Sequence, residues 1–437
     1  MPRLIVRRSL TAVGIYSSVV LGFLGTVVAT RELHSARHFG DFATVVFATG
    51  FLQSLFDLTV EEALVKYGFR YIAREEWGRL RRLFSSALRV KLAGSAAGAL
   101  GLVVFALLAP ARLETPLLVA ACIPLGYSLE GLAGAALFLR SRYDVRSLFL
   151  AWSMALRLAG IAVGAHYGLT WAIAGILIAQ VVSAASVGIA GRSALHRFPR
   201  VPPEKLGDDR RSIRSFVLQS SVATGVLSLR GGLAPLLLGA VTGTAQVGLF
   251  KVAQSPQAGL QALSAPARMV LLTEQTREWE RGRQGAVLAG VRRYSLVAFG
   301  LAVVAVPPLY VFLPDLIRWI NGPEYVGAAS AGRVLLLAAA VQLVVGWTKS
   351  FPVTIGKPQL RVWTHGAETI VILPLVVVLG ALWGATGAAV AVLAGMCVFA
   401  AMWTVIFLRI RPEDIGPPAP LGESVADAEA EVGILAR

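Results

Sequence analysis

Long apolar runs separated by short polar segments dominate this 437-residue chain. A helix needs about 20 mostly apolar residues to cross about 30 Å of hydrocarbon. The pattern predicts about twelve such helices, which use nearly the whole chain and leave no room for a separate soluble catalytic domain. The predicted spans are residues 10–30, 41–63, 88–110, 115–138, 147–166, 169–190, 214–241, 247–268, 294–314, 328–348, 362–381 and 384–408.

The composition supports the same conclusion. Hydrophobic residues make up 56% of the chain and charged residues only 15%, with a mean hydropathy of +0.68. A soluble protein has about 25% charged residues. The sequence therefore predicts an all-α polytopic membrane protein.

The net charge of +16 is typical of a nucleic-acid-binding protein, but the placement of the cations indicates a membrane topology instead. The predicted inner segments contain 31 lysines and arginines, and the predicted outer segments contain four. By the positive-inside rule, this asymmetry predicts that both termini lie in the cytoplasm. The basic inner segments also favour anionic lipid headgroups as neighbours. Nucleic acid is not predicted as a partner.

The chain contains an internal repeat. Residues 39–45 and 247–253 are similar and open the second and eighth spans, 208 positions apart. Residues 167–174 and 383–390 open the sixth and twelfth spans, 216 positions apart. Two similar offsets predict two six-helix halves. Because six is even, the halves are related by a parallel repeat about an axis near the membrane normal.

Polar segments divide the chain into its predicted parts. These are an N-terminal six-helix lobe at 1–190, a cytoplasmic linker at 191–213, a C-terminal six-helix lobe at 214–409 and a disordered tail at 410–437. Residues 273–284 are polar and predict an interfacial helix.

The motifs of common catalytic sites are absent from the sequence. The chain has no GxxxxGK[ST], HExxH, CxxC or GxSxG pattern. The longest predicted outer loop, Leu313–Gly327, is too short for an enzyme domain. We therefore predict no catalytic residues, no metal and no cofactor.

Charged residues at membrane depth are the candidate functional groups. Each costs about 2.5–3.5 kcal/mol at the centre of a bilayer, so such residues usually face the protein interior or a water-filled cavity. The candidates for substrate binding are Arg230, Arg157, Lys251 and Arg333. The candidates for ion coupling or structural pairing are Glu130, Asp57, His365 and Glu368.

Each candidate also has a structural interpretation. Glu130 and Arg157 either form a neutralising pair across neighbouring spans or act separately. Lys251 and Arg333 lie near outer helix ends, where their side chains either extend to the interface or line a cavity. Arg230 is mid-span and precedes Gly231, Gly232 and Pro235, so its helix is expected to be broken there. His365 either titrates near neutral pH or simply packs.

Several short motifs resemble those of the Wzx-type polysaccharide and O-antigen flippases, members of the multidrug/oligosaccharidyl-lipid/polysaccharide exporter (MOP) superfamily. Their order and spacing over nearly the whole chain carry the resemblance. The motifs are Phe39–Phe42, Asp57-Leu58, Gly243–Phe250, Asn321–Tyr325, Gly356–Pro358 and the Gly-rich start of the twelfth span. One departure is that Ala234-Pro235 stand where an acidic–basic pair of many relatives is expected.

The resemblance implies a two-lobed, MATE-like bundle of twelve helices around a central, typically cationic cavity. It also implies transport by alternating access of a polyprenyl-pyrophosphate-linked oligosaccharide across a bacterial cytoplasmic (inner) membrane, with glycan polymerase or glycosyltransferases as partners. Such a protein is a transporter and not an enzyme. The alternatives are a cation-coupled multidrug exporter of the same superfamily, which needs acidic residues in the cavity, and a membrane glycan polymerase or ligase, which needs a large outer loop.

Overall fold

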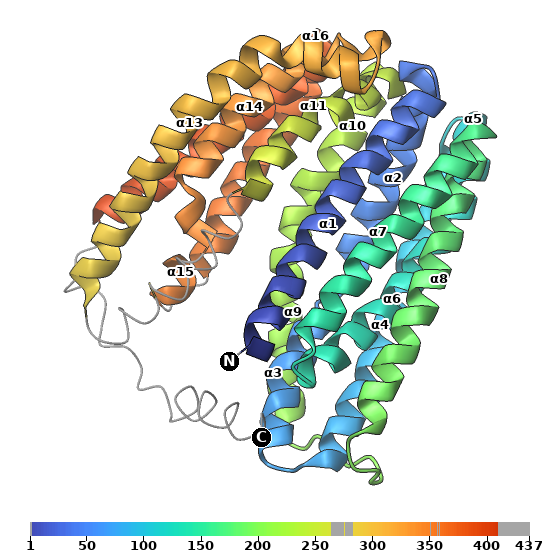
Figure 1. Ribbon diagram of the computed structural model, residues 1–437, viewed down its shortest axis with the longest axis vertical. Coiled ribbons are helices and arrows are strands. Elements are labelled where there is room, and N and C mark those ends of the chain that lie inside the picture. The colour runs from blue at the N-terminus through green and yellow to red at the C-terminus, as the bar shows by residue number, and fades with distance from the viewer. Residues whose placement is uncertain are drawn as a thin grey trace.

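The computed structural model describes residues 2–263, 275, 283–349, 351–355, 357 and 359–409, and those parts are predominantly helical. Two helical bundles lie together at one end and diverge toward the other (Figure 1). The N-terminal bundle consists of α1 (Pro2–Glu32), α2 (Ala36–Phe56), α3 (Val60–Ala73), α4 (Trp77–Leu108), α5 (Ala111–Ala120), α6 (Ile123–Leu139), α7 (Tyr143–His166) and α8 (Leu169–His196).

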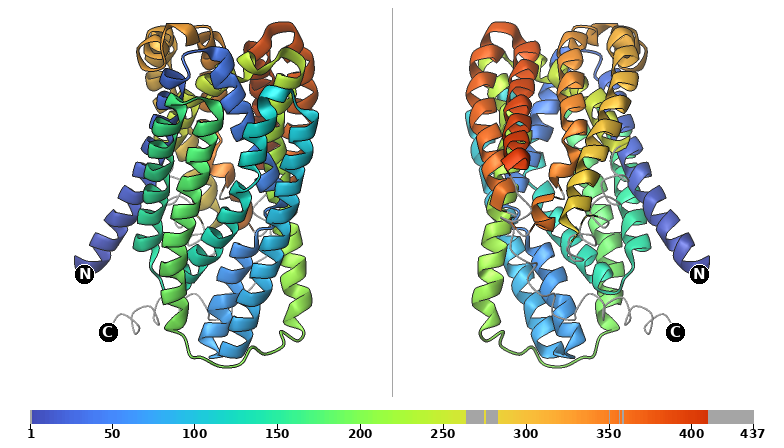
Figure 2. Two further views of the ribbon diagram at one scale, coloured as in Figure 1. Left: turned by 90° about the vertical axis from the view of Figure 1, so that its right-hand side faces the viewer. Right: turned by 90° about the vertical axis from the view of Figure 1, so that its left-hand side faces the viewer.

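The C-terminal bundle begins after residues 197–208, which connect it to α8. Its elements are α9 (Asp209–Ser228), the π-helical turn η1 (Leu229–Leu233), α10 (Ala234–Thr242), α11 (Thr244–Leu263), α13 (Gln284–Ile320), η2 (Pro323–Tyr325), α14 (Ala328–Val344), η3 (Gly346–Lys349), α15 (Phe351–Thr354) and α16 (Gln359–Arg409). Figure 2 shows that most of the long helices run roughly along the long axis of the molecule, whereas the N-terminal part of α1 leans away from its neighbours.

The predicted spans correspond to these helices. In the described part of the chain, nine helices are long and apolar enough to cross a membrane. One of them, α16, contains two spans, because its backbone at Gly384 leaves the helical region (φ 58°, ψ −135°). The 20-residue α11 and the shorter apolar α14 bring the total to about twelve.

Several predicted boundaries are wrong. The second span ends at Phe56 instead of residue 63, because Asp57–Thr59 interrupt the helix and α3 starts with acidic residues. The polar segment 64–87 is largely helical, forming α3 and the start of α4. The outer loop is also shorter than Leu313–Gly327, because α13 continues to Ile320.

The repeat is visible in where helices begin. The offset of 208 relates the first residue of α2, Ala36, to the first residue of α11, Thr244. The offset of 216 relates Gly168, which precedes α8, to Gly384 inside α16, and both glycines have positive φ angles of 111° and 58°. A positive φ favours glycine, which explains why the repeat keeps glycine at these turns.

The outer surface of the bundles is apolar where lipid would cover it. Large side chains that stay exposed include Leu108 (80%), Ile189 (72%) and Val304 (72%). The polar segments predicted to be inner, such as α3 and the α8–α9 connection, lie at the end where the bundles diverge (Figure 1). The predicted helix at 273–284 lies almost wholly outside the described residues, and the predicted disordered tail 410–437 lies entirely outside them.

Candidate functional site

The two bundles meet most closely where α2 crosses α11. A Cβ atom on Gly40 would lie 1.9 Å from the carbonyl oxygen of Thr244, and one on Gly248 would lie 2.7 Å from that of Ala36. These two contacts are equivalent under the 208-residue offset. The pseudo-twofold axis of the repeat therefore passes through this crossing, where only glycine lets the backbones approach so closely.

Further contacts join the bundles at the same end. Asn321 donates to the hydroxyl of Thr30 (3.1 Å), and the Tyr325 hydroxyl donates to the Thr30 carbonyl oxygen (3.2 Å). The Arg112 guanidinium pairs with Asp41 at 3.2 Å and contacts Thr244 of the other bundle at 3.4 Å. This end is closed by direct backbone and side-chain contacts.

At the opposite end, α9 of the C-terminal bundle lies against α3 of the N-terminal bundle. Arg70 pairs with Asp209 at 3.2 Å, and the Tyr71 hydroxyl donates to the same carboxylate at 3.1 Å. Burial and this hydrogen bond raise the pKa of Tyr71 to about 12, so its phenol stays protonated even in mildly alkaline conditions. About three turns further along α9, Ser220 donates a hydrogen bond to Glu62 of α3.

Two of the predicted substrate-binding cations lie on helices of different bundles. Arg157 lies on α7, and its guanidinium donates to the Tyr127 hydroxyl at 2.8 Å. Lys251 lies on α11, and its ammonium lies 4.9 Å from the centre of the Phe47 ring on α2. Lys251 is also within range of the repulsive charge of Arg157. Within the described residues, neither cation forms an ion pair with a carboxylate.

The predicted pair of Glu130 and Arg157 does not form. Glu130 is 4% exposed and pairs instead with Arg146 at 3.4 Å. Its second oxygen accepts from Gln180 at 2.9 Å and from Ser183 at 3.5 Å. The reason is geometric, because Arg146 and Arg157 are about three turns apart on one face of α7. Arg146 is nearer the α6–α7 connection, and Glu130 on α6 pairs with Arg146.

Arg230, another of the predicted substrate-binding cations, has a carboxylate partner. Its guanidinium lies 2.5 Å from Glu368 on α16, and His365 Nδ1 lies 3.0 Å from the other oxygen of that carboxylate. Glu368 is fully buried, and the His365 ring stacks on Phe399 at 4.8 Å. The helix is not broken at Arg230; it widens into the π-helical turn η1, which continues directly into α10. Arg230, Glu368 and His365 thus form one cluster.

Asp57 belongs to a second cluster that the sequence did not reveal. Lys91 on α4 is 2% exposed and pairs with Asp57 and, at 2.6 Å, with Glu61. Lys91 lies near the start of a predicted span, and only the helix packing shows that it points inward.

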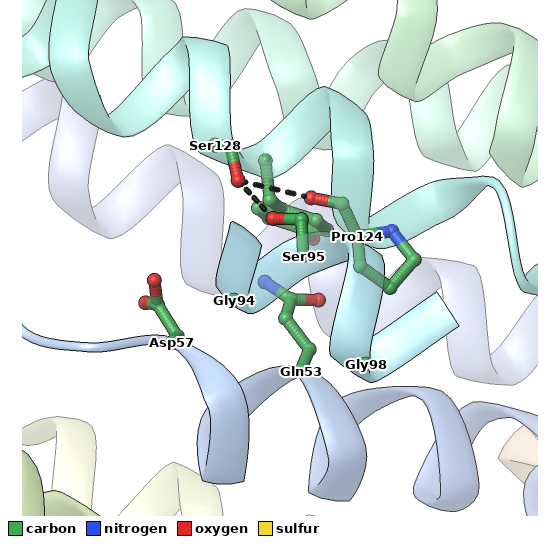
Figure 3. Close-up of a pocket in the computed structure, with 8 residues that line it drawn as sticks. Gln53, Asp57, Gly94, Ser95, Gly98, Pro124 and Ser128 are labelled. Atoms are coloured by element: carbon green, nitrogen blue, oxygen red, sulfur yellow. Dashed lines mark hydrogen bonds between the residues drawn. The ribbon is translucent and has the colours of Figure 1, made fainter. Parts of the chain in front are cut away.

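A small polar cavity adjoins this cluster between α2, α4 and α6 (Figure 3). Gln53 and Asp57 lie on one side of it, and the hydrogen-bonded hydroxyls of Ser95 and Ser128 lie on the other. Tyr127, which accepts from Arg157, also lines it. Polar groups therefore extend from the Asp57 cluster to Arg157.

Arg333 stays within the C-terminal bundle. Its guanidinium lies 5.1 Å from the Tyr310 ring centre and donates to the Tyr310 carbonyl oxygen at 3.0 Å. The described residues contain no group of three or more histidine, cysteine, aspartate and glutamate residues arranged to hold a metal ion.

Comparisons with known proteins identify the family and fold. Residues 8–272 match a family described as polysaccharide biosynthesis protein. No curated protein matches the chain by sequence.

Three solved structures illustrate the fold. The lipid II flippase MurJ, in an inward closed conformation, is 12% identical with a TM-score of 0.73, over 93% of this chain and 89% of that one. An inward-facing multidrug resistance MATE family transporter of the MOP superfamily is 12% identical with a TM-score of 0.66, over 95% and 99% of the two chains. The MATE multidrug transporter DinF-BH is 18% identical with a TM-score of 0.58, over 94% and 96%.

Proposed function

Since the chain belongs to the polysaccharide biosynthesis protein family and has the fold of MOP-superfamily transporters, we propose that it is a flippase for a polyprenyl-pyrophosphate-linked oligosaccharide. Among the similar structures, MurJ is by its description a flippase for lipid II. A pyrophosphate and several sugars do not cross hydrocarbon unaided, because each charged or polar group loses its hydration.

The observation that carries this proposal is the uncompensated pair of cations, Arg157 and Lys251. An isolated buried charge is costly, so two cations held near each other without a carboxylate favour an anionic ligand between them. A pyrophosphate has enough oxygens for both groups. The planar guanidinium of Arg157 suits bidentate binding of phosphate oxygens, and the ammonium of Lys251 adds a compact second charge.

A ligand held by both cations would connect the two bundles. Arg157 belongs to the N-terminal bundle and Lys251 to the C-terminal bundle. The ligand binds most tightly when both cations contact the pyrophosphate. Ligand binding therefore favours the conformation that brings Arg157 and Lys251 together. Rocking of the bundles about the α2–α11 crossing would then give alternating access, with the polyprenyl tail remaining in lipid.

The alternatives fit less well. A cation-coupled multidrug exporter needs acidic groups facing its substrate, whereas Glu130 and Glu368 each pair with an arginine and Asp57 and Glu61 both pair with Lys91. A glycan polymerase or ligase needs a large outer domain, and only residues 321–327 separate α13 from α14. We therefore assign a transport function and not an enzymatic one.

We also propose that the protein lies in the bacterial cytoplasmic membrane with both termini inside, which the distribution of cations supports. The functional units are the six-helix lobes at 1–190 and 214–409, joined by the 191–213 segment. Glycosyltransferases that build the lipid-linked glycan, and a polymerase that uses it, are the expected partners. A transmembrane ion gradient or removal of the product would supply the energy.

Glycan export in intact cells tests the proposal. Arg157→Gln and Lys251→Gln should each abolish export of surface glycan while the protein reaches the membrane in normal amount. Arg333→Gln is the matched control, because it also removes one cation from a span but leaves the bundle boundary intact. Full export by the Arg157 and Lys251 variants would contradict the proposal.

A further inference from the structure

A basic pocket lies outside the proposed transport site, lined by residues at the ends of α6, α7 and α8. The C-terminal end of α8 lies at the end where the bundles diverge (Figure 1). Its volume is about 360 Å³, which is within the range of ligand sites. Arg140 follows the last residue of α6, Arg142 precedes α7, and Arg197 follows α8. Three separate helix ends thus direct guanidinium groups to one hollow.

The three arginines retain most of their hydrogen-bonding capacity. Arg142 uses its Nε to pair with Asp144 at 3.2 Å, so its terminal nitrogens remain available. Arg140 stacks on the Phe198 ring at 5.1 Å, which fixes the plane of its guanidinium. None of the residues that line the pocket is acidic, and Ser193 adds a hydroxyl.

The rest of the pocket is apolar. Leu137, Val145, Ala190 and Ala194 complete the wall. Above it, toward the centre of the helices, α8 exposes Ile189 (72%) and Val182 (43%), one turn and about three turns from Ser193 on the same face. The arginine cluster therefore lies next to an exposed apolar strip on α8.

From this arrangement we propose that the pocket binds an anionic phospholipid, with the headgroup phosphate between Arg140, Arg142 and Arg197 and an acyl chain along α8. Basic pockets between helices on the cytoplasmic side of a membrane have the chemistry that such headgroups require. A soluble phosphate ion would satisfy the arginines but would leave the apolar wall and strip uncovered. The inference does not depend on the transported substrate.

Lipid titration of the purified full chain, followed by native mass spectrometry, tests this proposal. Dioleoylphosphatidylglycerol should bind more tightly than dioleoylphosphatidylcholine. The variant Arg140→Gln/Arg197→Gln should weaken phosphatidylglycerol binding about fivefold for each arginine removed. The matched control, Arg192→Gln/Arg200→Gln, removes the same charge from neighbouring residues that do not line the pocket, and should change binding by less than about twofold.

Two further variants separate a specific site from loss of folding. Arg140→Lys/Arg197→Lys keeps the charges and should retain most of the binding. Ala190→Phe fills the pocket without changing charge and should weaken phosphatidylglycerol binding, while the melting temperature in phosphatidylcholine stays unchanged. Equal weakening by the pocket and control double variants would overturn the proposal, and so would full binding by Ala190→Phe. Competition by inorganic phosphate as effective as competition by phosphatidylglycerol would overturn the assignment to a lipid.

Discussion

Charges inside the two bundles differ from charges at the boundary between them. Within the bundles, Glu130 is neutralised by Arg146, and Arg230 by Glu368. At the boundary, Arg157 donates to the Tyr127 hydroxyl and Lys251 lies beside the Phe47 ring. The positive charges of Arg157 and Lys251 also repel each other. Apart from Arg146, which lies near the start of α7, these charges lie well inside apolar helices and are costly there. Depth alone therefore does not distinguish the proposed binding cations from the paired ones; the absence of a carboxylate partner among the described residues does.

The largest expected effect comes from removing a partner inside a bundle. Glu368→Ala leaves Arg230 with an uncompensated charge and should destabilise the protein by about 3–5 kcal/mol. The folded yield, measured by size-exclusion chromatography of a fluorescent fusion, should fall sharply. The double variant Arg230→Gln/Glu368→Gln should recover much of the yield. Normal yield from Glu368→Ala would show that Arg230 does not need its carboxylate partner, and would contradict the distinction between paired charges and boundary cations.

Glu130 provides a second test with a smaller effect. Glu130→Ala removes the acceptor used by Arg146, Gln180 and Ser183, and should lower the free energy of unfolding by about 1–3 kcal/mol. The loss is smaller than for Glu368→Ala because Arg146 lies near the end of its helix. Arg157→Ala, in the same pair of helices, should leave thermal stability unchanged or higher, since it removes an unpaired charge. Melting curves of the two variants provide the measurement. Equal losses would mean that Arg157 has a structural partner after all.

The glycine crossing tests the boundary itself. Gly40→Ala places a Cβ against the Thr244 carbonyl oxygen and should cost about 1–3 kcal/mol through overpacking. Gly50→Ala, on the same helix, meets no atom within 4 Å and should be neutral or slightly stabilising. The melting temperatures of the Gly40→Ala and Gly50→Ala variants provide the measurement. A crossing that tolerates Gly40→Ala as well as Gly50→Ala would show that α2 and α11 are not tightly held.

The sequence predicts the fold far better than the partners of its charges. Hydrophobic runs give the number and depth of the helices, and the repeat correctly predicts that α2 and α11 are equivalent. Periodicity gives no information about which side of one helix faces which neighbour. For that reason the sequence leaves open whether Glu130 pairs with Arg157, and it does not indicate the Glu130–Arg146 pair, the Arg230–Glu368 contact across 138 residues or the buried position of Lys91.

The central claim is that the unpaired boundary cations bind the pyrophosphate and that the paired cations do not. Its most direct test is the affinity of the purified protein for a polyprenyl-pyrophosphate-linked oligosaccharide, measured for Arg157→Gln, Lys251→Gln and Arg146→Gln. Each of the first two variants should weaken binding about tenfold or more, because each loses a charge-assisted contact of about 1.5–3 kcal/mol. Arg146→Gln removes the same charge and should bind within about twofold of the unaltered protein. Similar affinities for all three variants would contradict the account.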